Sequence, residues 1–136
     1  MSSYKLETIE GVGPENAQRL LAAGVKTTGQ LLDACATPKG RAAMAVATGF
    51  SEDQLLKWTN LADLLRVKGV GEEYSELLEA AGVETVRELK ARRPDSLAAR
   101  MLEVNAKKNL VRQAPAESMV ARWIAHSKNL SGRVTY

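Results

Sequence analysis

Two short glycine turns are the parts of this sequence best suited to binding chemistry. Gly11-Val12-Gly13 and Gly69-Val70-Gly71 each stand directly before a segment with helical spacing. Glycine permits positive φ and close approach of the backbone, and the amides at a helix N-terminus favour an anion such as phosphate. Contacts of this kind hold a nucleic-acid backbone without reading a base. The two turns are therefore candidates for sequence-independent DNA contacts.

The two turns belong to a tandem repeat. Residues 9–33 read IEGVGPENAQRLLAAGVKTTGQLLD and residues 67–91 read VKGVGEEYSELLEAAGVETVRELKA, with identical residues at 11 of 25 positions and no gap. A weaker similarity relates Gln54–Trp58 to Met119–Trp123. Self-similarity at a fixed offset indicates duplication of one structural unit. The sequence predicts two units, residues 1–65 and 66–136, either as separate bundles or as one compact core.

Helix signals recur in both units, and no alternating strand pattern interrupts them. Aromatic residues make up only 4% of the chain, which favours helices over sheets. The expected helix starts are marked by caps at Thr27, Ser51 and Thr85 and by prolines at positions 14, 38 and 94, and the expected ends by glycines at positions 24 and 82. The signals predict an all-α fold of about ten short helices, which include segments near 6–9, 14–23, 51–65, 61–67, 72–81 and 116–130.

A helix, a Gly-hydrophobic-Gly turn and a second helix resemble the helix-hairpin-helix motif. In GVGPENAQRLLAAGVKTTGQLL, the small residue Ala17 stands where the motif packs its hairpin, and a Gly-Val-x-Thr turn follows. Similar pieces occur in DNA repair proteins, in Holliday-junction binding proteins and in the C-terminal domain of the RNA polymerase alpha subunit. The resemblance implies two tandem helix-hairpin-helix units, each a SAM-like small helical bundle. It implies DNA contacts at the turn residues Gly11, Val12, Gly13, Gly69, Val70 and Gly71.

The second unit is also similar to a more specific group. From residue 67 to residue 130 it resembles a bacterial family of uncharacterised domains that join such hairpins to a final helix. That helix has the form Val-Ala-x-Trp-Ile, here residues 120–124. This resemblance covers most of the chain when both units are considered, and it implies a fold without implying a settled role.

Acidic residues after the turns oppose a phosphate contact. Glu15 follows the first turn, but Arg19 lies one helical turn later, so the first turn is expected to be the better DNA contact. Glu72, Glu73 and Glu76 follow the second turn. Carboxylates there compete with phosphate for the helix N-terminus and repel it. The second turn is therefore expected to have kept its architecture and given up the phosphate, although Lys68 beside it could still contribute.

The basic residues concentrate in the C-terminal part of the chain. The formal net charge is +3, but residues 72–88 hold six glutamates and one arginine, whereas residues 89–136 hold ten basic and three acidic residues. A shared basic face would neutralise several phosphates and give salt-sensitive binding; an ordinary solvated face is the alternative. The candidate contacts are Lys90, Arg92, Arg93, Arg100, Lys107, Lys108 and Arg112.

Single residues narrow the classes of function. One cysteine, Cys35, and one histidine, His126, allow no internal disulfide and no structural zinc site. The sequence shows no nucleophile–base pair and no carboxylate cluster with metal spacing. We therefore expect no enzymatic activity, no metal and no cofactor. The N-terminal segment has no signal-peptide pattern, and no apolar run could cross a membrane. A cytoplasmic protein without membrane association is the expectation.

Several side chains have expected structural roles. Trp58 and Trp123 are expected to anchor the core, and Cys35 to fill a small space within it. His126 is expected at the surface, and the last six residues are expected to fray. Tyr74 is either an exposed partner contact or a lid on the second hairpin.

Two functions stay open. The first is a small non-enzymatic protein that binds DNA without sequence preference through the hairpins and the basic region. The second is a protein-interaction or scaffold module in which the hairpin fold no longer binds DNA. In that case the acidic segment 72–88 would pair with a partner or with the basic region of another copy. The motif and the basic C-terminal region favour DNA binding.

Overall fold

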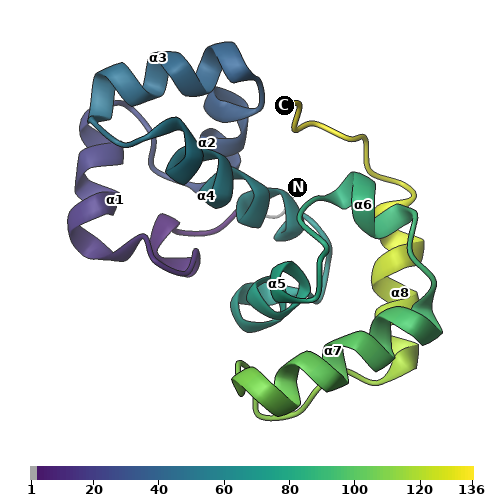
Figure 1. Ribbon diagram of the computed structural model, residues 1–136. Coiled ribbons are helices and arrows are strands. Elements are labelled where there is room, and N and C mark those ends of the chain that lie inside the picture. Colours follow the sequence, from purple (N-terminus) through teal and green to yellow (C-terminus); the bar gives the residue numbers. More distant parts are fainter. Residues whose placement is uncertain (1–2) are drawn as a thin grey trace.

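The computed structural model describes residues 3–136, which form helices joined by short turns (Figure 1). The predicted all-α class is confirmed, because the only β-type pairing in that range is an isolated bridge between Lys5 and Thr27. None of the helices described is long and apolar enough to cross a membrane. The elements are η1 (Leu6–Thr8), α1 (Gly13–Ala22), α2 (Thr28–Cys35), α3 (Pro38–Thr48), α4 (Glu52–Leu64), α5 (Gly71–Ala80), α6 (Val86–Lys90), α7 (Pro94–Lys108) and α8 (Glu117–Ser127).

Eight α-helices and one 3-10 turn replace the roughly ten short helices that we expected for the described chain. The segment near 61–67 was expected to be a separate short helix, but it is the end of α4 and the turn that follows. Neither glycine nor proline occurs between Ser51 and Lys68, so no residue breaks the helix there. One helix therefore closes the first unit and leads into the second.

Local boundary signals act as predicted. The side chains of Thr27, Ser51 and Thr85 accept hydrogen bonds from the amides three residues later, at 3.2, 3.1 and 3.3 Å. These bonds satisfy amides that a helix N-terminus leaves without partners. Pro38 and Pro94 begin α3 and α7, as their fixed φ favours. The starts of five helices are thus determined within a few residues of sequence.

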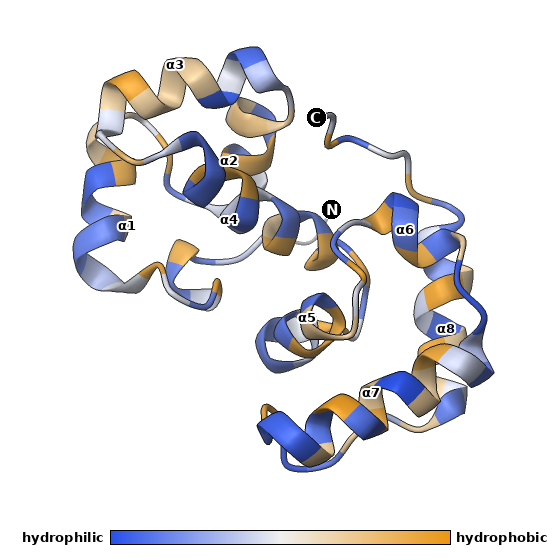
Figure 2. Cartoon of the chain, viewed as in Figure 1, coloured by the Kyte–Doolittle hydropathy of each residue, from blue (hydrophilic) through white to orange (hydrophobic). Residues whose placement is uncertain are grey.

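Two hydrophobic cores flank α4. The first includes residues from η1 to α4, and the second includes residues from α4 to α8. Leu61 and Leu65 of this segment pack into the first core, whereas Leu64 packs into the second. Trp58 is buried in the first core and Trp123 in the second, as expected. In Figure 2 the helices carry hydrophobic and hydrophilic segments side by side, as helices with one buried face do.

The C-terminal tail packs against the first unit, so the expectation that it frays is wrong. Val134 is buried in the first core. The Thr135 amide donates to the Ala36 carbonyl at 2.8 Å, and the buried guanidinium of Arg41 donates to the Thr135 carbonyl at 2.7 Å. Figure 1 shows the tail returning from α8 toward α2 and α4. A buried apolar side chain and paired backbone groups overcome the entropy of a free terminus.

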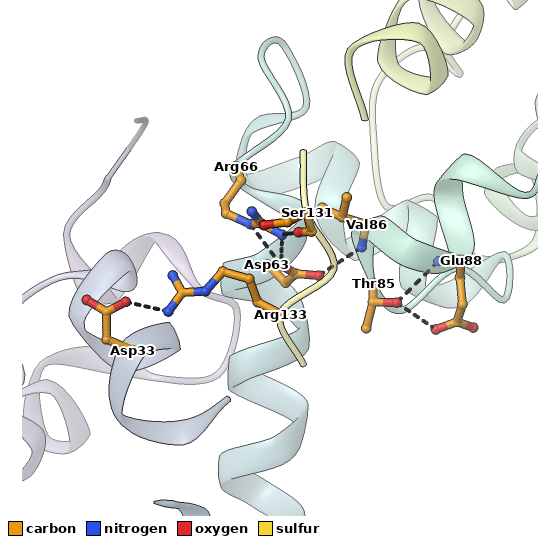
Figure 3. A network of polar contacts seen from close by, with 8 residues as sticks. All are labelled: Asp33, Asp63, Arg66, Thr85, Val86, Glu88, Ser131 and Arg133. Atoms are coloured by element: carbon orange, nitrogen blue, oxygen red, sulfur yellow. Dashed lines mark hydrogen bonds and ion pairs between the residues drawn. The ribbon is translucent and has the colours of Figure 1, made fainter. Parts of the chain in front are cut away.

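A buried ion pair lies where the tail, α4 and α6 meet (Figure 3). Asp63 and Arg66 form a salt bridge of 2.7 Å with little exposure of either side chain. The guanidinium of Arg66 also donates to the carbonyl of Ser131 at 2.7 Å. The second carboxylate oxygen of Asp63 accepts from the amide of Val86 at 2.8 Å. Both buried charges therefore have an opposite charge and a backbone hydrogen-bond partner, as burial of a charge requires.

Candidate nucleic-acid interface

The two glycine turns have nearly the same backbone geometry. The first glycines of the turns, Gly11 and Gly69, have φ of 88° and 91°. The second glycines, Gly13 and Gly71, both have φ of 64°. The central residues, Val12 and Val70, are 1% exposed, and their amides donate to the carbonyls of Ile9 and Val67 at 3.2 Å. Their side chains and amides are thus used within the fold. Any contact to a ligand at these positions falls to the glycines and the helix start.

A tryptophan from the closing helix of each unit lies under the turn. A Cβ atom built on Gly11 would lie 3.7 Å from Nε1 of Trp58, and one built on Gly69 would lie 3.3 Å from Nε1 of Trp123. The positive φ favours glycine at both positions, and the tight 3.3 Å approach adds a steric reason at Gly69. The weak similarity between residues 54–58 and 119–123 therefore marks the same structural role.

Arg19, the basic residue expected to assist the first turn, is engaged within the chain. Its guanidinium donates to the carbonyl of Thr48 at 2.6 Å and lies 3.9 Å from the centroid of the Phe50 ring. These contacts tie α1 to the loop between α3 and α4. Arg19 also lines a shallow groove with Glu15. Beside the first turn, a phosphate would therefore meet the carboxylate of Glu15 and a guanidinium, that of Arg19, which is already hydrogen-bonded.

The second turn borders a groove with a different lining. This groove of about 540 Å³ is lined by Lys68, Gly69, Met119, Arg122, Trp123, Ala125 and His126, none of which is acidic. The amide of Lys68 donates to Nδ1 of His126 at 3.1 Å. In the neutral ring Nε2 then carries the hydrogen and acts as the donor. His126 is half-buried and lines the groove, so it lies at the surface as expected, and its ring also holds the turn.

The glutamates of α5 do not line this groove, although Glu72 and Glu73 are exposed in the first turn of the helix that begins beside it. The pKa of Glu76 is raised, first by burial and then by the nearby carboxylates of Glu10 and Glu79. Burial also raises the pKa of Glu79, although Lys57 of α4 opposes that shift. These partners place the two carboxylates near the first turn and α4. None of the α5 glutamates lines the groove beside Gly69.

Tyr74 covers the second turn from the other side. It is half-buried, and its ring centroid lies 5.2 Å from that of Trp123 at an interplanar angle of 53°. Its hydroxyl donates to the Gln113 carbonyl at 3.4 Å. The sequence left two roles open for Tyr74, a partner contact or a lid on the second hairpin. Its contacts with Trp123 and Gln113 are those of a lid.

The structure brings together only part of the predicted basic face. Arg100, Lys107 and Lys108 line one shallow groove of about 220 Å³ between α7 and the end of α5. Two of the candidates are paired with acids nearby: Arg93 with Asp95 at 3.0 Å and Arg100 with Glu103 at 3.5 Å. The Arg93 guanidinium lowers the pKa of the Asp95 carboxyl. The other candidates lie apart from this groove: Lys90 and Arg92 at the end of α6 and Arg112 in the loop after α7.

Arg122 and His126 are site residues that sequence reasoning missed. Both lie on α8, 54 and 58 positions after Lys68 in the chain, so only packing of α8 against the turn brings them together. Their spacing of four residues places them on one face of a helix. That spacing is the signal in the sequence that could have indicated a shared surface.

Comparison with known proteins gives a family assignment. No curated protein and no solved structure matches the chain. The family model described as "Domain of unknown function (DUF4332)" matches residues 10–130. The matched range contains the helices from α1 to α8 and both glycine turns, and it ends before the tail residue Val134. Because the match spans most of the 136 residues, the chain belongs to this family of domains of unknown function.

Proposed function

We propose that this protein is a non-enzymatic DNA-binding protein, built from two tandem helix-hairpin-helix units, that holds the phosphate backbone without reading sequence. The observation that carries the proposal is the groove beside Gly69. Its polar lining residues, Lys68, Arg122 and His126, are cations or neutral donors. Phosphate oxygens accept hydrogen bonds from such groups.

The backbone at this turn supports the same chemistry. The N-cap of α5, Val70, makes no side-chain capping bond, so an external acceptor at the helix start competes only with the exposed carboxylates of Glu72 and Glu73 for its amides. The positive end of the α5 dipole adds a favourable potential for an anion. The main phosphate contact is then at the second turn, although the sequence favoured the first. Arg19, which would assist the first turn, already bonds Thr48 and stacks on Phe50.

The basic groove on α7 supplies a second candidate contact. Arg100, Lys107 and Lys108 lie there together with one acid, Glu103, which pairs with Arg100, and α7 packs against α8. Neutralising phosphates at both grooves would make affinity depend steeply on salt, with each phosphate contributing a slope of about −0.9 in log affinity against log salt. Binding through backbone phosphates alone would be independent of DNA sequence.

Fluorescence anisotropy with a labelled mixed-sequence duplex tests the proposal at salt concentrations from about 50 to 200 mM. The double variant Lys68→Glu/Arg122→Glu should lose at least about tenfold in affinity at low salt. The double variant Lys26→Glu/Lys39→Glu is the matched control, because both lysines are exposed outside the groove and the net charge changes equally.

Equal losses in the two double variants would show that only net charge matters, and would overturn the assignment of the groove. Absence of binding at about 50 mM salt would overturn DNA binding itself. That second result would favour the alternative in which the same fold is a protein-interaction or scaffold module. Circular dichroism of each variant separates loss of binding from loss of the helical fold.

A further inference from the structure

A second groove, on a different part of the molecule, has the opposite charge. It has a volume of about 420 Å³ and lies between α4 and the segment from α5 to the turn before α6. Three carboxylates and one ammonium group supply its charges. The lining residues are Asp53, Leu56, Lys57, Asn60, Glu79 and Glu84.

Asn60 provides an observation that is independent of the acidic residues. Its side chain is only 4% exposed, and among residues 3–136 its Oδ1 atom has no hydrogen-bond partner. A buried acceptor without a donor is unusual, because losing hydration without replacing it destabilises the fold. Asn60 also lines the groove. A donor from outside the chain would explain why the fold tolerates the amide at this position.

The carboxylates nearby are crowded in the unbound protein. The pKa of Glu79 is raised mainly by burial and also by Glu84, whereas Lys57 and Lys108 lower it. Glu76, on the same helix, has a pKa raised by burial and by Glu10 and Glu79. Each shift means that the ionised form is disfavoured there. A bound cation would offset the effect of burial, which is the main cause of both shifts, and of the smaller repulsion between carboxylates.

We propose that the groove between α4 and α5 binds the guanidinium of an arginine presented by a basic segment of a partner protein. A guanidinium offers five N–H donors in a planar fork. It can therefore donate to the neutral Asn60 oxygen and to carboxylates such as Glu79 at the same time. An ammonium lacks this planar geometry. Within the described chain no three His, Cys, Asp or Glu side chains are arranged to hold a metal ion.

The inference concerns different residues from the DNA proposal. None of the residues lining this groove lines the groove beside Gly69. Its occupant is a cation, whereas the groove beside Gly69 suits an anion. Either site can therefore fail its test without affecting the outcome at the other.

The probe is a fluorescein-labelled peptide in which glycine alternates with arginine, compared with the same peptide carrying lysine in place of arginine. Anisotropy titrations with the full chain should show tighter binding of the arginine peptide. Asn60→Leu and Glu79→Gln should each weaken that binding by about tenfold, the effect of losing a charge-assisted hydrogen bond. Glu73→Gln is the matched control, because Glu73 is on α5 outside the groove; it should change binding by less than about twofold.

A stability measurement makes the test sharper. Because Oδ1 of Asn60 has no partner in the free protein, Asn60→Leu should raise the urea midpoint while it weakens peptide binding. DNA affinity of this variant should stay unchanged. If Asn60→Leu does not fold, the double variant Glu79→Gln/Glu84→Gln takes its place in the binding test. Equal affinity for the arginine and lysine peptides, or binding that survives both groove variants, would overturn the proposal.

Discussion

The carboxylate of Asp63, in the last turn of α4, accepts a 2.8 Å hydrogen bond from the amide of Val86, the first residue of α6. At the matching position of the first unit, the amide of Thr28 donates instead to the backbone carbonyl of Tyr4 at 2.9 Å. The two bonds fix the starts of corresponding helices, α2 in the first unit and α6 in the second. The second unit uses a charged side chain from the shared helix, and Arg66 balances its charge.

Removing Asp63 should be strongly destabilising. Asp63→Ala leaves the buried guanidinium of Arg66 without its counter-ion and the Val86 amide without its acceptor, and should cost about 3–5 kcal/mol. Urea denaturation followed by circular dichroism measures the change. Asp33→Ala is the control, because the ion pair of Asp33 with Arg133 is partly exposed and should contribute less than about 1 kcal/mol. Similar losses in both variants would contradict a special role for Asp63.

The tail should contribute to the stability of the first unit. Val134→Ala removes two buried methyl groups from the first core and should cost about 1.5 kcal/mol. Tyr136→Ala, two residues later, changes a side chain that is 66% exposed and should alter stability by less than about 0.5 kcal/mol. Deleting residues 131–136 should exceed the cost of Val134→Ala, since it also removes one carbonyl acceptor from each of Arg41 and Arg66. A deletion without effect on the urea midpoint would show that the tail is not needed for stability.

Alanine substitutions in the glycine turns should rank in a defined order. Gly71→Ala places a Cβ in open space and should cost about 1–2 kcal/mol, the strain of a left-handed conformation. Gly69→Ala adds a tight contact of 3.3 Å with Trp123 Nε1 and should cost about 1 kcal/mol more. Gly11→Ala, with a 3.7 Å contact to Trp58, should resemble Gly71→Ala. Thermal unfolding gives the ranking, and a smaller loss at Gly69 than at Gly71 would contradict it.

The carboxylates between α5 and the first unit should make stability depend on pH. Burial raises the pKa of Glu76 and Glu79 in the folded protein. The folded state then binds protons more tightly than the unfolded state, so these groups favour folding as pH falls through the raised pKa toward the ordinary value. When both groups are ionised, the two carboxylates repel each other.

Glu76→Gln should therefore stabilise the protein at neutral pH by about 0.5 kcal/mol. The substitution removes a negative charge that burial and the neighbouring carboxylates disfavour. The gain should shrink as the pH falls toward the ordinary carboxyl range. Glu73→Gln should show no gain, since Glu73 lies in the first turn of α5, where the helix dipole favours a negative charge. Urea midpoints from pH 4 to pH 8 measure both effects. A gain in Glu76→Gln that is the same at every pH would exclude a titrating cause.

Most of the secondary structure followed from local sequence. The caps at Thr27, Ser51 and Thr85 and the prolines at 38 and 94 all begin helices in the structure. The exception is α4, where two expected elements merge. The repeat placed both turns correctly, because a run of residues with the same turn chemistry adopts the same φ angles.

The candidate site was predictable only in part. Lys68 and Gly69 were identified from their place in the second turn, whereas Arg122 and His126 were not, because they reach the turn through the packing of α8. The glutamates after the second turn were expected to exclude a phosphate from it. In the structure Glu76 lies toward the first unit, near Glu10 and Lys57, a direction set by contacts between units that no local pattern encodes. Glu72 and Glu73 stay in the first turn of α5, where the sequence placed them.

The sequence by itself determined the helices, their ends and the two glycine turns, because propensity, capping and positive φ depend on residues a few positions apart. The tertiary structure alone decided that α4 borders both cores, that Val134 enters the first core, and that a basic groove and an acidic groove form from different sets of residues. Those features join residues up to about a hundred positions apart, as between Arg133 and Asp33. Burial of apolar surface sets such contacts, and it acts between whole elements.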